Sequence, residues 1–119
     1  MAAGDIFVFG SNLAGQHSGG AAFFARTERG AEAGKWIGRT GQAFAIPTCD
    51  AQIRPLPLKE IARYVLSFIA YAQQHPDLTF EVTRIGCGIA GFTDAQIAPL
   101  FTGAPENCQL PDGWREMAA

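Results

Sequence analysis

The stretch Ile6-Phe7-Val8-Phe9-Gly10-Ser11-Asn12-Leu13 decides the fold class. Its first four residues are all apolar, which is typical of a short strand buried on both faces of a parallel sheet. A glycine-containing loop, residues 10–20, follows the strand and leads into an alanine- and phenylalanine-rich stretch, residues 21–25, that we interpret as a helix. The order of buried strand, glycine loop and helix predicts an α/β domain.

Two further strands are expected. Residues 43–46 (Ala-Phe-Ala-Ile) form a second short apolar run after the glycine-rich residues 34–41, and we expect Pro47 to stop this strand. Residues 78–85 alternate apolar and polar side chains and run into a second glycine-rich loop, residues 86–92. Both glycine-rich loops, residues 10–20 and 86–92, therefore follow a strand.

The segment from Leu58 onward has the most regular helical pattern in the chain. Its apolar residues recur at three- and four-residue spacing: Ile61, Ala62, Val65, Leu66, Ile69 and Ala72. Pro57 and Pro76 bound this helix, because proline is tolerated in a first turn and excluded from a helix interior. A second helix is expected where Thr93 and Gln96 have the spacing of a capping box, and Pro99 should kink or shorten it.

Strands that alternate with helices predict one three-layer α/β/α domain over residues 1–119, with a mostly parallel or mixed sheet and helices on both faces. We expect Ile61, Val65 and Ile69 to be buried against that sheet. Ligands of such sheets bind beyond the carboxyl ends of the strands, which is where both glycine loops are expected.

The composition excludes several classes of protein. The 119 residues are 48% hydrophobic and 17% charged, which is too apolar for a disordered chain and too interrupted for a membrane span. No basic region followed by an apolar run marks the N-terminus, so the cytoplasm is the expected location. The three cysteines are far apart, which argues against a disulfide framework or a zinc site, and we expect neither metal nor cofactor. A net charge of −2 disfavours general nucleic-acid binding.

Paired glycine loops suit a diphosphate ligand. A diphosphate needs several convergent N–H donors and close approach of the backbone, and glycine permits both. The helix that begins near Gly20 would add its unpaired first amides. Either loop alone is equally well explained by packing, so the pairing of the two carries the interpretation. Neither loop has the pattern of a P-loop or of a dinucleotide-binding fingerprint.

The second loop also resembles a known family. Arg84-Ile85-Gly86-Cys87-Gly88-Ile89-Ala90-Gly91-Phe92 is similar to the phosphate loop of a macro-domain subgroup that includes terminal ADP-ribose glycohydrolases and macro domains of toxin–antitoxin systems. The strand and loop of residues 6–22 resemble the macro-domain strand that ends in an asparagine and continues through glycines into a helix. The resemblance spans residues 6–101. It implies a macro-like fold and, as the ligand, ADP-ribose, an ADP-ribosylated target or a related nucleotide diphosphate.

The resemblance also implies a set of site residues. Asn12 and Phe92 would contact the distal ribose, and the two glycine loops would hold the phosphates from opposite sides. The full ligand-binding set is Gly10, Ser11, Asn12, His17, Gly19, Gly20, Ala21, Gly86, Cys87, Gly88, Ile89, Ala90, Gly91 and Phe92. His17 has a simpler interpretation as a solvated loop residue, and Cys87 as a small residue that fits a tight turn.

Catalysis is where the sequence departs from the subgroup. The related hydrolases carry a lysine just after the second strand and an acid in the second loop, whereas this chain has Thr48-Cys49 and Ala90 at those positions. If an ADP-ribosyl linkage is hydrolysed, Asn12, Asp50 and Asp94 are the groups most able to orient an attacking water. The alternatives are a non-catalytic reader or sequestering module for a nucleotide signal, and an interaction protein whose cleft is vestigial.

Overall fold

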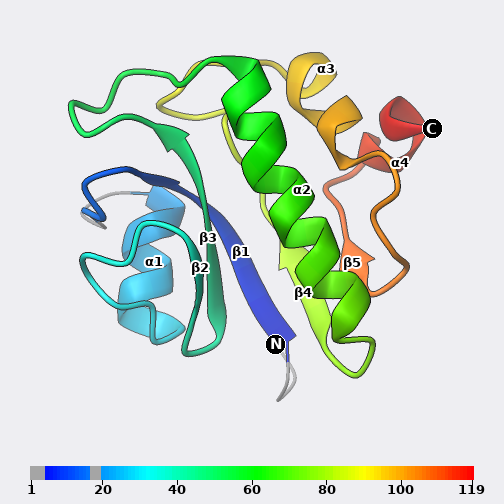
Figure 1. The fold of residues 1–119 in the computed structure, drawn as a ribbon, viewed down its shortest axis with the longest axis horizontal. Coiled ribbons are helices and arrows are strands. Elements are labelled where there is room, and N and C mark those ends of the chain that lie inside the picture. Colours follow the sequence, from blue (N-terminus) through cyan, green and yellow to red (C-terminus); the bar gives the residue numbers. More distant parts are fainter. Residues whose placement is uncertain (1–4, 17–19) are drawn as a thin grey trace.

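The fold is that of a computed structural model that describes residues 5–16 and 20–119. It is a five-stranded sheet with helices packed against it (Figure 1). The elements in chain order are β1 (Asp5–Asn12), α1 (Gly20–Glu28), β2 (Gly38–Thr40), β3 (Ala43–Cys49), α2 (Leu58–Gln74), β4 (Thr79–Val82), α3 (Asp94–Ile97), the 3-10 helix η1 (Ala98–Phe101), β5 (Cys108–Gln109) and α4 (Trp114–Ala118).

The sheet is mixed, with strand order β2-β3-β1-β4-β5. The central strand β1 pairs in parallel with β3 on one side and β4 on the other, and β5 extends the parallel part beyond β4. Only β2, at the opposite edge, runs antiparallel to its neighbour β3. The α/β class and the mostly parallel pairing predicted from the sequence are therefore present.

Alternate residues of β1 belong to two separate clusters of buried side chains. Ile6 and Val8 pack in the larger cluster, which includes the buried residues of α2. Phe7 and Phe9 pack in the smaller cluster with Ala25 of α1. Because successive side chains of a strand point to opposite faces, α1 and α2 cover different faces of the sheet. All four strand residues are less than 8% exposed, as the uninterrupted apolar run predicted.

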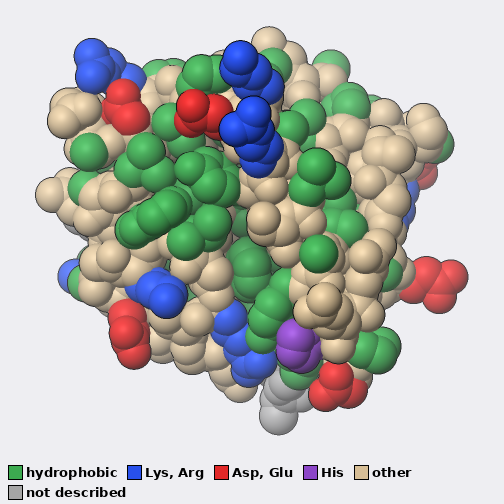
Figure 2. Space-filling view, viewed as in Figure 1, with side chains coloured by type: hydrophobic (Ala, Val, Ile, Leu, Met, Phe, Trp, Pro, Cys, Tyr) green, Lys and Arg blue, Asp and Glu red, His purple; other side chains and the backbone are tan. Residues whose placement is uncertain are grey.

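The predicted stripe on α2 is largely confirmed. Ile61, Val65 and Ile69 are buried, and so is Phe68, which fills the same face one turn along the helix. Leu66, which shares the helical spacing but was not predicted to be buried, is 60% exposed. Leu66 follows Val65 and is rotated about 100° from it, which turns its side chain to solvent. The face of the molecule around α2 mixes hydrophobic groups with basic and acidic ones (Figure 2).

The second strand does not stop at Pro47. β3 continues to Cys49, and Pro47 is fully buried opposite Ser11 of β1. Proline is tolerated here because β2 pairs with β3 only from Ala43 to Ala45, so the outer side of β3 needs no ladder hydrogen bond at Pro47. The strand predicted at residues 78–85 is shorter than expected: β4 covers only Thr79–Val82.

The C-terminal third contains elements that the sequence patterns did not predict. β5 and α4 are short, and α4 is anchored by Trp114, which is fully buried. The capping box at Thr93 is present, and α3 passes into the 3-10 helix at Pro99, as expected. In the described part of the chain, no helix is both long and apolar enough to span a bilayer.

Candidate functional site

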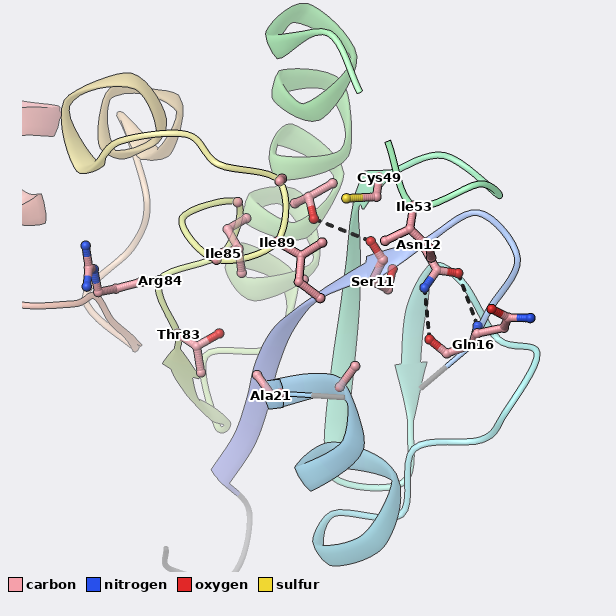
Figure 3. A pocket seen from close by; sticks show the side chains of 17 residues that line it. Ser11, Asn12, Gln16, Ala21, Cys49, Ile53, Thr83, Arg84, Ile85 and Ile89 are labelled. Atoms are coloured by element: carbon pink, nitrogen blue, oxygen red, sulfur yellow. Dashed lines mark hydrogen bonds between the residues drawn. The ribbon is translucent and has the colours of Figure 1, made fainter. Parts of the chain in front are cut away.

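A pocket of about 420 Å³ opens at the carboxyl ends of the three central strands (Figure 3). β1 and β3 contribute their last residues, and the chain just after β4 contributes Thr83. The lining residues are Gly10, Ser11, Asn12, Gln16, Gly20, Ala21, Ala22, Thr48, Cys49, Ile53, Thr83, Arg84, Ile85, Gly86, Gly88, Ile89 and Ala90. The two glycine loops thus meet at one cavity, in the place that a parallel sheet favours for ligands.

Asn12 lines the pocket, and its side chain shapes the loop that follows β1 (Figure 3). Its Oδ1 accepts hydrogen bonds from the amides of Ala14 and Gln16 at 3.1 and 3.2 Å, and its Nδ2 donates to the Gln16 carbonyl at 2.9 Å. This local bonding is typical of an asparagine that folds a turn. Asn12 therefore supports the pocket wall, with its polar atoms already engaged.

The N-terminus of α1 forms a second wall. Gly20, Ala21 and Ala22 belong to its first turn and all line the pocket. The first amides of a helix have no partner within the helix and carry the positive end of its dipole. This wall therefore brings the N-terminal end of a helix to the cavity without any charged side chain.

The loop of residues 86–91 supplies more N–H donors. It is closed by hydrogen bonds from the amide of Gly91 to the Gly88 carbonyl (3.0 Å) and from the amide of Phe92 to the Gly86 carbonyl (2.8 Å). Between these bonds, the amides of Gly88, Ile89 and Ala90 donate to no acceptor in the part of the chain that the structure describes. Three consecutive amides without an acceptor, in a loop that lines a cavity, are donors available to an anion.

Asp94 holds this loop from outside the pocket. Its carboxylate accepts hydrogen bonds from Nε and Nη2 of Arg84, each at 2.9 Å, and from Nε1 of Trp114 at 2.9 Å. The bonds from Arg84, and then the one from Trp114, hold the pKa of Asp94 below its ordinary range. The thiol of Cys87 lies 3.7 Å from the same carboxylate, and burial, with the nearby Asp94 charge, raises its pKa. Neither Asp94 nor Cys87 lines the cavity.

Both carboxylate oxygens of Asp50 also accept hydrogen bonds from neighbouring residues. Its Oδ1 accepts from the amides of Gln52 and Arg54, both at 2.9 Å, and its Oδ2 pairs with Nε of Arg54 at 3.2 Å. The hydrogen bond from the Arg54 amide is the main cause that lowers the pKa of Asp50. Asp50 folds the loop after β3 and does not line the pocket.

The end of β3 contributes two residues that the sequence reasoning did not place in the site. Thr48 is buried and donates from its hydroxyl to the Ser11 carbonyl at 3.4 Å, while the Ser11 hydroxyl donates to the Trp36 carbonyl at 2.6 Å. Cys49 is buried, and this burial raises the pKa of its thiol. A thiol that stays protonated at neutral pH is a weak nucleophile. The available signal for both residues was their position shortly after the apolar run of residues 43–46.

The structure thus brings together most of the predicted ligand-binding residues. Those that line the pocket are Gly10, Ser11, Asn12, Gly20, Ala21, Gly86, Gly88, Ile89 and Ala90. Cys87, Gly91 and Phe92 shape the second loop without lining the cavity, and His17 and Gly19 lie outside the described residues. Within residues 5–16 and 20–119, no group of three or more metal-ligating side chains is close enough to hold an ion.

Ile53 also lines the pocket without belonging to the predicted set, and so do Gln16, Ala22, Thr83, Arg84 and Ile85. Ile53 lies in the loop after β3 and has a positive φ of 62°.

Comparison of the chain with protein-family models, with curated proteins and with solved structures finds no match in any of the three.

Proposed function

We propose that the protein binds ADP-ribose or a related nucleotide diphosphate in the pocket at the end of β1. The observation that carries this proposal is that the first turn of α1 and the loop of residues 88–90 meet at one cavity. Among the described residues, the amides of Gly88, Ile89 and Ala90 have no acceptor, and the first amides of a helix have no partner within the helix. A diphosphate has two linked anionic groups, so donors on two walls match its shape and charge.

The apolar side chains in the pocket favour a nucleotide as the ligand over a free inorganic anion. Ile53, Ile85 and Ile89 line the cavity beside the amides, so the pocket offers apolar surface next to its anion-binding groups. Ligand sites commonly combine apolar lining with a few placed polar groups. The resemblance of residues 84–92 to the macro-domain phosphate loop supports the same ligand. A macro-like three-layer sandwich is part of this proposal.

A binding module without catalysis is the version that the site favours. Among the described residues that line the pocket, there is no carboxylate and no lysine. Asp50 and Asp94 are both engaged with arginine side chains, and Asn12 is engaged with its own loop. Asp50 and Asp94 do not line the cavity, and both polar side-chain atoms of Asn12 already form hydrogen bonds with their own loop, so these groups are poorly placed to orient a water.

Calorimetric titration tests the binding proposal. We expect the protein to bind ADP-ribose, to bind ADP more weakly, and to bind adenosine, which lacks the diphosphate, not measurably. Equal affinity for ADP-ribose and adenosine would contradict the amide clamp. The catalytic alternative is tested by incubating the protein with ADP-ribosylated protein and ADP-ribosylated nucleic acid. We expect no release of ADP-ribose, and release by the wild type would establish the hydrolase instead.

A further inference from the structure

Ile53 has an unusual backbone conformation for its residue type. Its φ of 62° makes it the one non-glycine residue with a positive φ in the described part of the chain. A β-branched side chain in the left-handed region is a true outlier, because its Cβ crowds the following carbonyl. Such strain persists only where the surroundings fix it, and it is concentrated at functional sites.

The loop that contains Ile53 is fixed on both sides by Asp50. The carboxylate of Asp50 accepts from the amides of Gln52 and Arg54. The backbone of Asp50 donates to the Arg54 carbonyl at 2.8 Å and accepts from the Ile53 amide at 3.0 Å. Residues 50–54 therefore form a closed ring of hydrogen bonds, in which Ile53 cannot relax its φ without breaking several of them.

The strained backbone directs an apolar side chain to the pocket. Ile53 lines the cavity and remains 37% exposed. Ile89, in the glycine loop, lines the same cavity and is 74% exposed (Figure 3). Because β3 and β4 lie on either side of β1, the loops that follow them contribute these two side chains from opposite sides of the pocket.

We infer that Ile53 and Ile89 are the two apolar walls that hold the nucleobase of the bound nucleotide. The inference rests on the proposed function and identifies the part of the ligand that each wall contacts. The phosphates are assigned to the amides of α1 and of residues 88–90, so the exposed isoleucines need a partner with apolar faces. In a nucleoside diphosphate the base is the flat group whose two faces are least hydrated. Ile53 is accordingly a specificity-determining residue, and Asp50 positions it.

Two substitutions of Ile53 separate its role in binding from its role in folding. Ile53→Asn places in the left-handed region a residue that tolerates it, so the variant should unfold at or above the wild-type temperature. The same variant should bind ADP-ribose at least about tenfold more weakly, because its side chain is polar. Ile53→Val keeps a branched apolar wall and should bind within about threefold of the wild type. Leu66→Asn, on the exposed side of α2, is the matched control and should leave affinity unchanged.

Saturation-transfer NMR gives the direct readout. Irradiation of the protein methyl protons should transfer more saturation to the base protons of ADP-ribose than to its ribose protons, and Ile53→Asn should reduce that preference. Bound ADP-ribose whose ribose protons receive the larger share would overturn the inference, as would unchanged affinity of Ile53→Asn. Either result would leave the proposed function standing. Failure of the wild type to bind ADP-ribose would overturn both.

Discussion

Substitution of Gly88 by valine is the sharpest test of the amide clamp. A Cβ built at Gly88 meets no atom of residues 5–16 or 20–119 within 4 Å, and Gly88 lines the pocket beside the amides of Ile89 and Ala90. The side chain of Gly88→Val can therefore enter the cavity without disturbing its neighbours. It should keep a phosphate from approaching the backbone of residues 88–90.

The size of the effect follows from the bonds that would be lost. A hydrogen bond to a charged group contributes about 1.5–3 kcal/mol. Loss of one such bond should weaken ADP-ribose binding by roughly ten- to a hundredfold. The free energy of unfolding should change by less than about 1 kcal/mol, because nothing in the core is touched.

Calorimetric titration of ADP-ribose, with thermal unfolding measured on the same samples, checks both expectations. Ala70→Val is the matched control, since it adds the same side chain on the exposed side of α2. Its cost in helix propensity is only a few tenths of a kcal/mol, roughly. Wild-type affinity in a folded Gly88→Val protein would refute the argument that the amides of this loop hold the ligand.

Three other predictions follow from the loops around the pocket. Asp94→Asn should make the free energy of unfolding depend less on pH in the acid range. The hydrogen bonds from Arg84 lower the folded-state pKa of Asp94. The stabilisation that they provide is therefore present above the ordinary carboxyl pKa and is lost as the pH falls through the lowered pKa. Gly15→Ala should destabilise the fold by about 2–4 kcal/mol in denaturant titrations, because Gly15 has a φ of 69° and its Cβ would lie 2.5 Å from the carbonyl carbon of Gly34. Asn12→Ala should lower both the unfolding temperature and the affinity for ADP-ribose, because Asn12 folds the loop at the pocket. If the wild type released ADP-ribose from a target and this variant did not, with unfolding temperature and affinity unchanged, the catalytic interpretation of Asn12 would be restored.

The sequence predicted the parts of the fold that depend on local pattern. Uninterrupted apolar runs identified residues 6–9 of β1 and 43–46 of β3, although β1 continues to Asn12 in what was expected to be loop, and the three- and four-residue spacing identified α2. Pro47 was interpreted wrongly because its tolerance depends on where β2 stops pairing with β3, which is a tertiary property. No periodic signal marks strands and helices as short as β5 and α4.

The candidate site shows the same division. Glycine spacing placed both loops correctly at the carboxyl ends of the strands. The roles of Asp50 and Asp94 were not visible, because a carboxylate that folds a loop and one that faces a ligand look alike in sequence. Trp114, which donates to Asp94, is twenty residues away along the chain. Ile53 was missed because a β-branched residue predicts an extended backbone, whereas Asp50 holds this one in the left-handed region.

The proposed diphosphate would be bound almost entirely by backbone groups. Arg84 is the one basic side chain among the described residues that line it, and its guanidinium is paired with Asp94. The net charge of −2 provides no long-range attraction for an anion. Amide dipoles inside a cavity are screened by salt much less than exposed ion pairs are, so the affinity for ADP-ribose should change by less than about threefold between 50 and 500 mM salt. A steep loss of affinity over that range, measured by the same titration, would instead mean that Arg84 leaves Asp94 to pair with the phosphates, and Arg84→Gln would then remove the salt dependence.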